Sequence, residues 1–343
     1  GGAKVNADNL AHGCPLNWRH PQQRPRGGAR CGCRTGAVPA VHEHTTPPLA
    51  ISGSTALVGV IGDPVRHSLS PAMQNAALQA MGLDWVFLAL PAPPDRFQAV
   101  VDSLETLGCR GLNVTIPHKQ AACALARELS PLATRLGAVN TLVPRAEGGW
   151  FGTNTDVEGF CAPLRAQDAE AWRGQTAVVL GCGGSARAVV AGLVDLGLQS
   201  VAVAGRDPER LGAFAADSAG WAPSLQPLDW RNTDALEQAL AEANLVVNTT
   251  PVGMRSTQDP TAVDRCPLSP AQLDRLRPGS TVYDLIYTPR PTRLLQEASA
   301  RGCRSVDGAE MLVQQGAAAL RLWSGRSDVP VATMRQALLD QLP

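Results

Sequence analysis

Short apolar runs alternate with amphipathic segments from Thr55 to the C-terminus. Such alternation predicts βαβ units built around a mainly parallel sheet. The apolar runs form two series, which indicates an α/β fold with two lobes. We expect strands at 57–61, 85–90, 111–116 and 139–143 in the first lobe, and at 176–180, 200–204, 245–248 and 281–285 in the second.

The helix expected after the first strand is marked at both ends. Ser70 suits the N-cap, Pro71 the first helical position, and Gly82 the position that ends a helix. Between these two ends, four apolar residues lie at helical spacing, which predicts one apolar face: Met73, Ala77, Ala80 and Met81.

Two lobes imply two domains, and 343 residues are enough for two cores. Segment 157–164 is expected to cross from the first lobe to the second, and the last two helices to return to the first. The predicted domains are therefore 55–156, completed by 310–343, and 157–309.

Residues 1–54 differ from the rest of the chain. They are rich in Pro, Gly, His and Arg, contain only Asp8 and Glu43 as acids, and show no periodicity, so we expect a disordered tail. An Arg-rich, acid-poor segment leaves a plastid transit peptide open, whereas the missing apolar core argues against a secretory signal. We expect no metal site, because the spacing of zinc ligands is absent from the candidates Cys14, Cys31, Cys33, His12, His20, His42 and His44.

The composition of the chain indicates which kinds of binding partner to expect. Thirty basic and thirty acidic residues leave no net charge, which removes the usual electrostatic reason to expect nucleic acid or an anionic membrane. The apolar run 188–198 is interrupted by Asp195, far short of a membrane span. Nine scattered cysteines fit reduced thiols in the cytoplasm. We expect a small-molecule ligand, and a homodimer is compatible with these features.

A glycine-rich motif follows the strand that ends at Leu180 and precedes the helix expected at 187–196. Its residues are Gly181, Cys182, Gly183, Gly184, Ser185 and Ala186. In this context the G-x-G-x-x-A form predicts a dinucleotide site, because glycines let a pyrophosphate approach the backbone at a helix N-terminus. The alternative is a glycine-rich turn that binds nothing.

Polar motifs cluster near strand ends of the first lobe, at 68–70, 113–119, 137–141 and 154–156. Ligands of open α/β sheets bind at the carboxyl ends of strands, so hydroxyls, amides, a lysine and an aspartate gathered there suit a polyhydroxylated ligand. Each residue has a plainer alternative. Ser70 can cap a helix, Asn113 and Asn140 can satisfy turns, and Lys119 can be a solvated lysine.

The order and spacing of these motifs resemble the shikimate dehydrogenase family from about residue 57 to the C-terminus. The resemblance rests on His67-Ser68-Leu69-Ser70-Pro71, Asn113-Val114-Thr115-Ile116-Pro117-His118-Lys119, Gly137-Ala138-Val139-Asn140-Thr141, Asn154-Thr155-Asp156, the glycine motif, Tyr283-Asp284-Leu285-Ile286-Tyr287, and Asp307-Gly308 followed by Met311-Leu312-Val313-Gln314-Gln315.

The resemblance implies an N-terminal substrate-binding domain and a Rossmann-type NADP-binding domain. It also implies reversible NADPH-dependent reduction of 3-dehydroshikimate to shikimate in aromatic amino-acid and chorismate biosynthesis, with Lys119 and Asp156 as the proton-transfer pair. The shikimate pocket would be lined by Ser68, Ser70, Asn113, Thr115, Lys119, Asn140, Asp156, Tyr287 and Gln315. The cofactor would be bordered by Gly181, Cys182, Gly183, Gly184, Ser185, Arg206, Arg210, Leu285, Gly308 and Met311.

Two positions depart from the family. His118 stands where an aromatic residue is frequent, and we expect it to be structural or solvent-facing rather than a second acid. Gly205-Arg206-Asp207 stands where the family often has Asn-Arg-Thr or Asn-Arg-Ser. Gly205 also lies near the place where NAD-binding folds carry an acid for the ribose hydroxyls, and Arg206 and Arg210 follow it. Two arginines without that acid predict a preference for NADP, although Asp207 between them would repel a phosphate if it pointed inward.

Three other functions remain as alternatives. The segment 67–75 also resembles quinate/shikimate dehydrogenases, which use NAD or NADP. A methylenetetrahydrofolate dehydrogenase has a similar architecture and a lysine, but the serine and Asn-Thr-Asp motifs favour a carboxylated polyol. A non-catalytic NADPH-binding regulator is disfavoured because Lys119 and Asp156 are both present.

Overall fold

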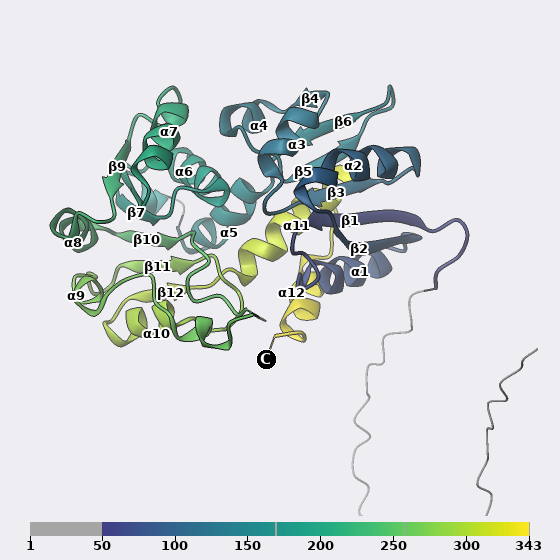
Figure 1. Ribbon diagram of the computed structural model, residues 1–343. Coiled ribbons are helices and arrows are strands. Elements are labelled where there is room, and N and C mark those ends of the chain that lie inside the picture. Colours follow the sequence, from purple (N-terminus) through teal and green to yellow (C-terminus); the bar gives the residue numbers. More distant parts are fainter. Residues whose placement is uncertain (1–49, 169, 257, 343) are drawn as a thin grey trace, which may run out of the picture. The chain divides into compact units, whose positions relative to one another are not determined.

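The computed structural model describes residues 50–168, 170–256 and 258–342 (Figure 1). The expectations of disorder, of a transit peptide and of no metal site concern residues 1–49, which lie outside the described residues. The last part of segment 1–54 is described. Ser54 and Thr55 donate hydrogen bonds to the carboxylate of Asp84, at 2.8 and 2.6 Å, so this part of the chain belongs to the first lobe.

The first lobe contains a mixed six-stranded sheet in the order β2-β1-β3-β5-β6-β4. Strands β1, β2 and β3 are parallel, whereas β5 runs antiparallel to β3 and to β6. The expected strand at 139–143 begins two residues later, because the amide of Val139 bonds to the carbonyl of Lys119. The strands are β1 (Ala56–Gly62), β2 (Trp85–Pro91), β3 (Gly111–Val114), β4 (Glu128–Leu129), β5 (Thr141–Pro144) and β6 (Trp150–Thr153).

The helices of the first lobe connect these strands. Helix α1 starts at Ser70, but Leu69 occupies the N-cap and no side chain caps the helix, so the expected capping role of Ser70 is wrong. The helix ends before Gly82 as expected. The helices are α1 (Ser70–Ala80), η1 (Pro94–Arg96), α2 (Phe97–Thr106), α3 (Lys119–Leu125) and α4 (Pro131–Leu136).

The second lobe is built on a parallel sheet in the order β12-β11-β10-β7-β8-β9. This is the strand order of the Rossmann fold, so the predicted fold class is confirmed. The strands are β7 (Thr176–Leu180), β8 (Ser200–Gly205), β9 (Leu225–Asp229), β10 (Leu245–Asn248), β11 (Thr281–Asp284) and β12 (Arg304–Val306). The helices are η2 (Glu170–Trp172), α6 (Gly184–Asp195), α7 (Pro208–Ser218), α8 (Thr233–Glu242), η3 (Pro260–Asp264), α9 (Pro270–Leu273) and α10 (Arg293–Ala300).

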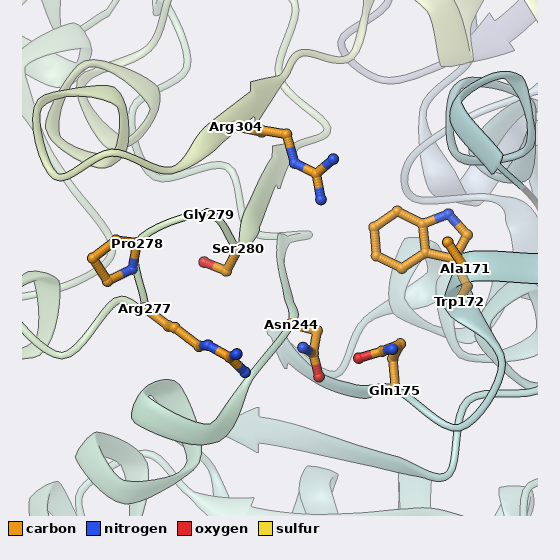
Figure 2. A pocket seen from close by; sticks show the side chains of 9 residues that line it. All are labelled: Ala171, Trp172, Gln175, Asn244, Arg277, Pro278, Gly279, Ser280 and Arg304. Atoms are coloured by element: carbon orange, nitrogen blue, oxygen red, sulfur yellow. The ribbon is translucent and has the colours of Figure 1, made fainter.

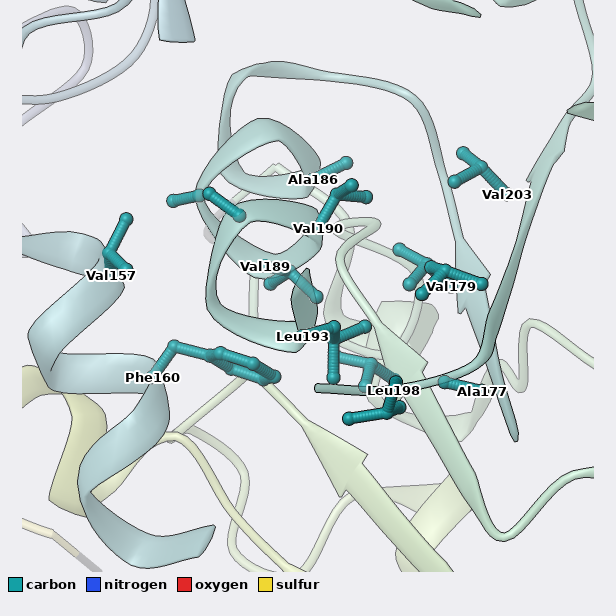
Figure 3. Close-up of a cluster of buried hydrophobic side chains, with 14 of the residues drawn as sticks. Val157, Phe160, Ala177, Val179, Ala186, Val189, Val190, Leu193, Leu198 and Val203 are labelled. Atoms are coloured by element: carbon teal, nitrogen blue, oxygen red, sulfur yellow. The ribbon is translucent and has the colours of Figure 1, made fainter. Parts of the chain in front are cut away.

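Helix α5 (Asp156–Asp168) leads from the first sheet to the second and starts one residue earlier than expected. Its residues Val157 and Phe160 face Val189 and Leu193 of α6 in the apolar cluster of the Rossmann lobe (Figure 3). Phe160 also stacks on Tyr283 of β11, with ring centroids 5.2 Å apart. These contacts fix the orientation of α5 and therefore the position of its first residue, Asp156.

The C-terminal helices α11 (Ala309–Ser324) and α12 (Val331–Leu339) pack on the first lobe. Val313 and Leu320 of α11 join the cluster formed by Val58 and Val60 of β1, and the indole of Trp323 donates to the carbonyl of Leu142 at 3.0 Å. Among the described residues, no helix is both long and apolar enough to cross a membrane.

Candidate active site

Lys119 and Asp156 form a buried ion pair at the edge of the first sheet. Each is the first residue of a helix, α3 and α5 respectively. Lys119 Nζ lies 2.5 Å from Asp156 Oδ2, and their side chains are only 14 and 10% exposed. Lys119 is therefore not the solvated lysine of the plainer alternative.

Asn140 holds the other oxygen of this carboxylate. Its amide nitrogen donates to Asp156 Oδ1 at 2.7 Å, and its amide oxygen accepts from the backbone N–H of Thr155 at 2.7 Å. The hydroxyl of Thr141 adds a bond of 2.9 Å to the same oxygen. This network orients the carboxylate. The sequence motifs contain Thr141 and Thr155, but no pattern in them indicated this supporting role.

The mixed sheet explains how these residues meet. Asn113 pairs with Thr141, and Thr141 pairs with Thr153, in antiparallel register. The start of β5 therefore lies at the same edge as the ends of β3 and β6. The residues that precede β5 and follow β3 and β6 therefore lie together, although β5 runs antiparallel to both neighbours within the mainly parallel sheet.

Three hydroxyl groups predicted for the substrate lie on loops or at a helix start at this edge. Ser68 and Ser70 follow β1, and Thr115 directly follows β3. The hydroxyl oxygen of Ser68 accepts a hydrogen bond of 3.2 Å from the backbone N–H of Ser70. In the described part of the chain, the hydroxyls of Ser70 and Thr115 form no hydrogen bond. Both are thus free to bind a ligand.

The remaining substrate candidates come from different elements. Asn113 lies on β3 and donates to the hydroxyl of Thr141 at 3.3 Å, but its buried Oδ1 has no partner among the described residues. Gln315 lies on α11 against the first turn of α5, since a Cβ atom on Gly159 would come within 2.8 Å of its side chain. The Gln315 amide donates to the carbonyl of Leu312 at 2.8 Å.

Tyr287 follows β11 in the second lobe yet packs on the apolar cluster of the first lobe, as Leu69 does. Burial raises the pKa of the Tyr287 phenol, against the opposing effect of a hydrogen bond with the backbone of Leu69. This contact places Tyr287 beside the Ser68–Ser70 loop. The phenol is expected to remain a neutral hydrogen-bonding group there.

The glycine loop lies close to Lys119. Gly181 has a φ of +105°, and a Cβ atom on it would come within 2.7 Å of the hydroxyl of Thr249. Gly183 and Gly184 are exposed, and α6 begins at Gly184 without a side-chain cap, three residues before the helix start expected from the sequence. A Cβ atom on Gly184 would lie 3.8 Å from Lys119 Cδ. The loop and the ion pair therefore border the same space.

Three further cofactor candidates are grouped at the end of β11. A Cβ atom on Gly308 would lie 2.0 Å from the carbonyl oxygen of Leu285, so only glycine fits there. Leu285 and Met311 both pack with the cluster around α6. The structure thus brings Leu285, Gly308 and Met311 together, although they are 26 positions apart at most in the sequence.

Arg206 and Arg210 are exposed at the end of β8 and the start of α7. Asp207 caps α7 by accepting hydrogen bonds from the backbone N–H groups of Glu209 and Arg210, at 3.0 and 3.2 Å. Its carboxylate is therefore committed to the helix end. Gly205 has no side chain that could accept from a ribose hydroxyl, and a Cβ atom there would meet the sulfur of Cys182 at 3.1 Å.

His118 is structural. It is 2% exposed, its Nε2 lies 2.7 Å from the carbonyl oxygen of Ala92, and its ring stacks on Phe97 at 4.4 Å between centroids. Of the two roles expected from the sequence, the structural one is confirmed and the solvent-facing one is wrong.

Comparison with known proteins agrees with this arrangement. The chain is 50% identical over 294 residues to the shikimate dehydrogenase (NADP(+)) of Trichormus variabilis, covering 85% of this chain and 99% of the relative. This chain belongs to the shikimate dehydrogenase family. The family model of the shikimate dehydrogenase substrate binding domain matches residues 60–142, and that of the shikimate 5'-dehydrogenase C-terminal domain matches residues 308–339. Residues 177–266 match the saccharopine dehydrogenase NADP binding domain.

Solved structures show the same fold. The shikimate 5-dehydrogenase of Thermus thermophilus in complex with NADP(H) and shikimate is 36% identical, with a TM-score of 0.72 over 84% of this chain and 100% of that chain. A quinate dehydrogenase from Corynebacterium glutamicum in complex with NAD is 33% identical, with a TM-score of 0.72 over 83% and 99% of the two chains. The family predicted from the motifs is therefore confirmed.

Proposed function

We propose that this chain catalyses the reversible, NADP-dependent oxidation of shikimate to 3-dehydroshikimate, with reduction as the biosynthetic direction. The observation that carries the proposal is the buried Lys119–Asp156 pair beside the glycine loop. The relative from Trichormus variabilis, which is named a shikimate dehydrogenase (NADP(+)), supports both substrate and cofactor. The family implies a place in the pathway to chorismate and the aromatic amino acids.

The reaction moves one proton and one hydride. When bound, the cofactor would supply the hydride as NADPH in the reduction and accept it as NADP⁺ in the oxidation. In the oxidation Lys119 Nζ takes the proton of the reacting hydroxyl, and in the reduction it returns a proton to the carbonyl oxygen. Asp156 holds that nitrogen at 2.5 Å, and Asn140 prevents the carboxylate from turning away by binding its other oxygen at 2.7 Å.

The free hydroxyls and amides bind the rest of the substrate. Ser68 and Ser70 hold the carboxylate, and Tyr287, which packs next to their loop, assists them. Thr115 and Gln315 read ring hydroxyls, whereas the Asn140 amide is occupied by Asp156 and Thr155 and supports the site from behind. The unpartnered oxygen of Asn113 needs a donor, and a ring hydroxyl is such a donor.

The glycine loop fits a dinucleotide. Nothing within 4 Å would meet a Cβ atom on Gly183, so a pyrophosphate can approach the uncapped N-terminus of α6. The remaining loop residues Gly181, Cys182, Gly184 and Ser185 border it, and Leu285, Gly308 and Met311 border the cofactor on the side of β11. Arg206 and Arg210 bind the 2′-phosphate of NADP.

A quinate dehydrogenase is the second candidate, but the relative with that name is 33% identical, against 50% for the shikimate enzyme.

We place the activity in the cytoplasm. Every cysteine within the described ranges is a free thiol, in agreement with a reducing compartment.

A spectrophotometric assay with four substrate pairs tests the proposal. Shikimate and quinate are each combined with NADP and with NAD, and formation of the reduced cofactor is followed. We expect the highest kcat/KM for shikimate with NADP. Faster turnover of quinate would assign the chain to the second candidate, and no turnover of either substrate would contradict the proposed activity.

A further inference from the structure

A second pocket lies at the opposite edge of the Rossmann sheet from the glycine loop. It is formed where β7, β10, β11 and β12 begin, whereas the glycine loop follows the end of β7. Its volume is about 510 Å³, within the range of small-molecule sites. The residues that line it are Ala171, Trp172, Gln175, Asn244, Arg277, Pro278, Gly279, Ser280 and Arg304 (Figure 2).

The pocket carries two positive charges and no negative one. Arg277 and Arg304 line it, and no carboxylate does. Within the described ranges neither guanidinium forms an ion pair. Two arginines close to them in sequence do form ion pairs. Arg275 pairs with Glu237 at 3.0 Å, and Arg301 pairs with Asp274 at 2.7 Å. The two arginines that face the pocket are thus available to an anion.

Neutral donors surround the same space. Asn244 uses its amide oxygen to accept from the backbone N–H of Thr176 at 3.2 Å, which leaves its amide nitrogen for the pocket. The side chain of Gln175 has no hydrogen bond among the described residues. Among the described residues, the hydroxyl of Ser280 hydrogen-bonds only to the sulfur of Cys303, at 3.6 Å. In Figure 2 the guanidinium groups of Arg277 and Arg304 point into the open space beside these groups.

The floor of the pocket is rigid. Trp172 is 5% exposed, and its indole N–H donates to the carbonyl of Leu164 in α5 at 3.1 Å. Ser280 is also buried and directly precedes β11. The indole and the strand starts therefore form an ordered base beside the two exposed arginines.

We propose that this pocket binds a small organic anion with at least two negative charges, a phosphate ester or a polycarboxylate. Arginine matches planar or tetrahedral oxyanions through paired charge-assisted hydrogen bonds. One phosphate or chloride ion would fill only a small part of about 510 Å³, so the volume favours an organic anion. The site is separate from the NADP site and does not depend on the proposed function.

Isothermal titration calorimetry on the NADP-saturated enzyme tests the proposal, because saturation removes phosphate binding at the glycine loop. The probes are inorganic pyrophosphate for the phosphate class and citrate for the polycarboxylate class. We expect saturable binding of at least one probe, and the tighter one identifies the class. If neither probe binds, the proposal is wrong.

The variants Arg277→Gln and Arg304→Gln locate the binding. Each should weaken binding of the probe at least tenfold, and the double variant more. Arg110→Gln is the matched control, because Arg110 is an exposed arginine of the first lobe that forms no ion pair within the described residues. Equal loss in the control, or full binding in the double variant, would refute the site. Unchanged kcat with shikimate in all variants verifies that they fold.

Discussion

Lys119 Nζ lies 2.5 Å from Asp156 Oδ2, across 37 residues of sequence and two different helices. Lys119 is one of only two lysines in the chain, with Lys4 the other, and all other basic positions carry arginine or histidine. Lysine differs from arginine in that it can release its proton near neutral pH when its surroundings favour the neutral form. A lysine at position 119 therefore suits proton transfer in a way that an arginine would not.

Two substitutions of Lys119 distinguish the effect of its positive charge from its role in proton transfer. Lys119→Ala should lower kcat by ~10²–10⁴-fold, the usual effect of a positioned acid or base, with a much smaller change in KM for shikimate. Lys119→Arg keeps a cation beside Asp156 but cannot release a proton, so it should lower kcat by a similar factor. If Lys119→Arg retains most of the turnover in a steady-state assay, the residue acts only through its charge.

Asp156→Asn keeps the shape of the side chain and removes its charge. The amide group would then face both Lys119 and the amide of Asn140, so one donor would lose its acceptor. We expect kcat to fall at least tenfold and the thermal midpoint to fall as well, because Lys119 would keep a largely buried charge without its counter-ion. The control Asn140→Ser leaves Asp156 charged but unsupported, and should reduce kcat less. Equal kcat in wild type and Asp156→Asn would exclude Asp156 from the reaction.

Hydrophobic periodicity predicted most of the Rossmann sheet but missed its two edge strands. The residues of β9 include Pro227 and exposed side chains, and β12 has only three residues, with exposed Arg304 and Ser305. Edge strands are covered on one side only and need no continuous apolar run. Their existence depends on pairing with β8 and β11, which is tertiary information.

The residue types of the candidate site could be predicted from the sequence, but the hydrogen bonds between them could not. Motif order indicated that Asn140 and Asp156 belong to one site. That Asn140 bonds Asp156 and Thr155 follows from the antiparallel register of β5 and β6, which no local pattern encodes. For Ser70 the residue type was misleading. Serine favours the N-cap of a helix, yet the turn at Ser68 places Leu69 at the N-cap of α1.

Cofactor choice should depend on Arg206 and Arg210. Both are exposed, and Arg210 lies 3.5 Å from Asp207, whose carboxylate is already occupied by backbone N–H groups. Arg206→Ala should raise KM for NADP at least tenfold and change KM for NAD little, because only NADP carries the 2′-phosphate. Arg110→Ala is the control for loss of a surface charge. Parallel increases in both KM values would show that Arg206 does not contact the phosphate.

Glycine at 308 should be essential, in contrast to glycine at 212. Gly308→Ala would place Cβ 2.0 Å from the carbonyl oxygen of Leu285, so the backbone at the proposed cofactor site must shift. We expect a lower thermal midpoint and a higher KM for NADP. Gly212 lies inside α7 with open space around it, so Gly212→Ala should stabilise the fold by ~0.5–1 kcal/mol. Thermal unfolding of both variants provides the comparison, and an unperturbed Gly308→Ala variant would contradict the close approach.

Asp284 is a fully buried carboxyl group at the end of β11. Its oxygens accept hydrogen bonds from the Asn248 amide at 3.0 Å, the Ile286 backbone N–H at 3.1 Å and the Thr292 hydroxyl at 2.7 Å. Burial nevertheless raises its pKa from 3.8 to about 6, because these three neutral donors replace bulk water incompletely.

This raised pKa should make the stability of the protein depend on pH. Between about pH 4 and 6 the folded state holds the Asp284 proton that the unfolded state has released, so the contribution of Asp284 falls as pH rises through this window. A rise from 3.8 to about 6 corresponds to about 3 kcal/mol between pH 4 and 7, at ~1.4 kcal/mol for each pKa unit. Asp284→Asn can keep all three hydrogen bonds, since its amide nitrogen can donate to Thr292, and it does not titrate. Urea unfolding at pH 4, 5, 6 and 7 should therefore show the variant gaining stability relative to wild type as pH increases. A difference between the two proteins that is constant with pH would mean that Asp284 has an ordinary pKa in the folded state.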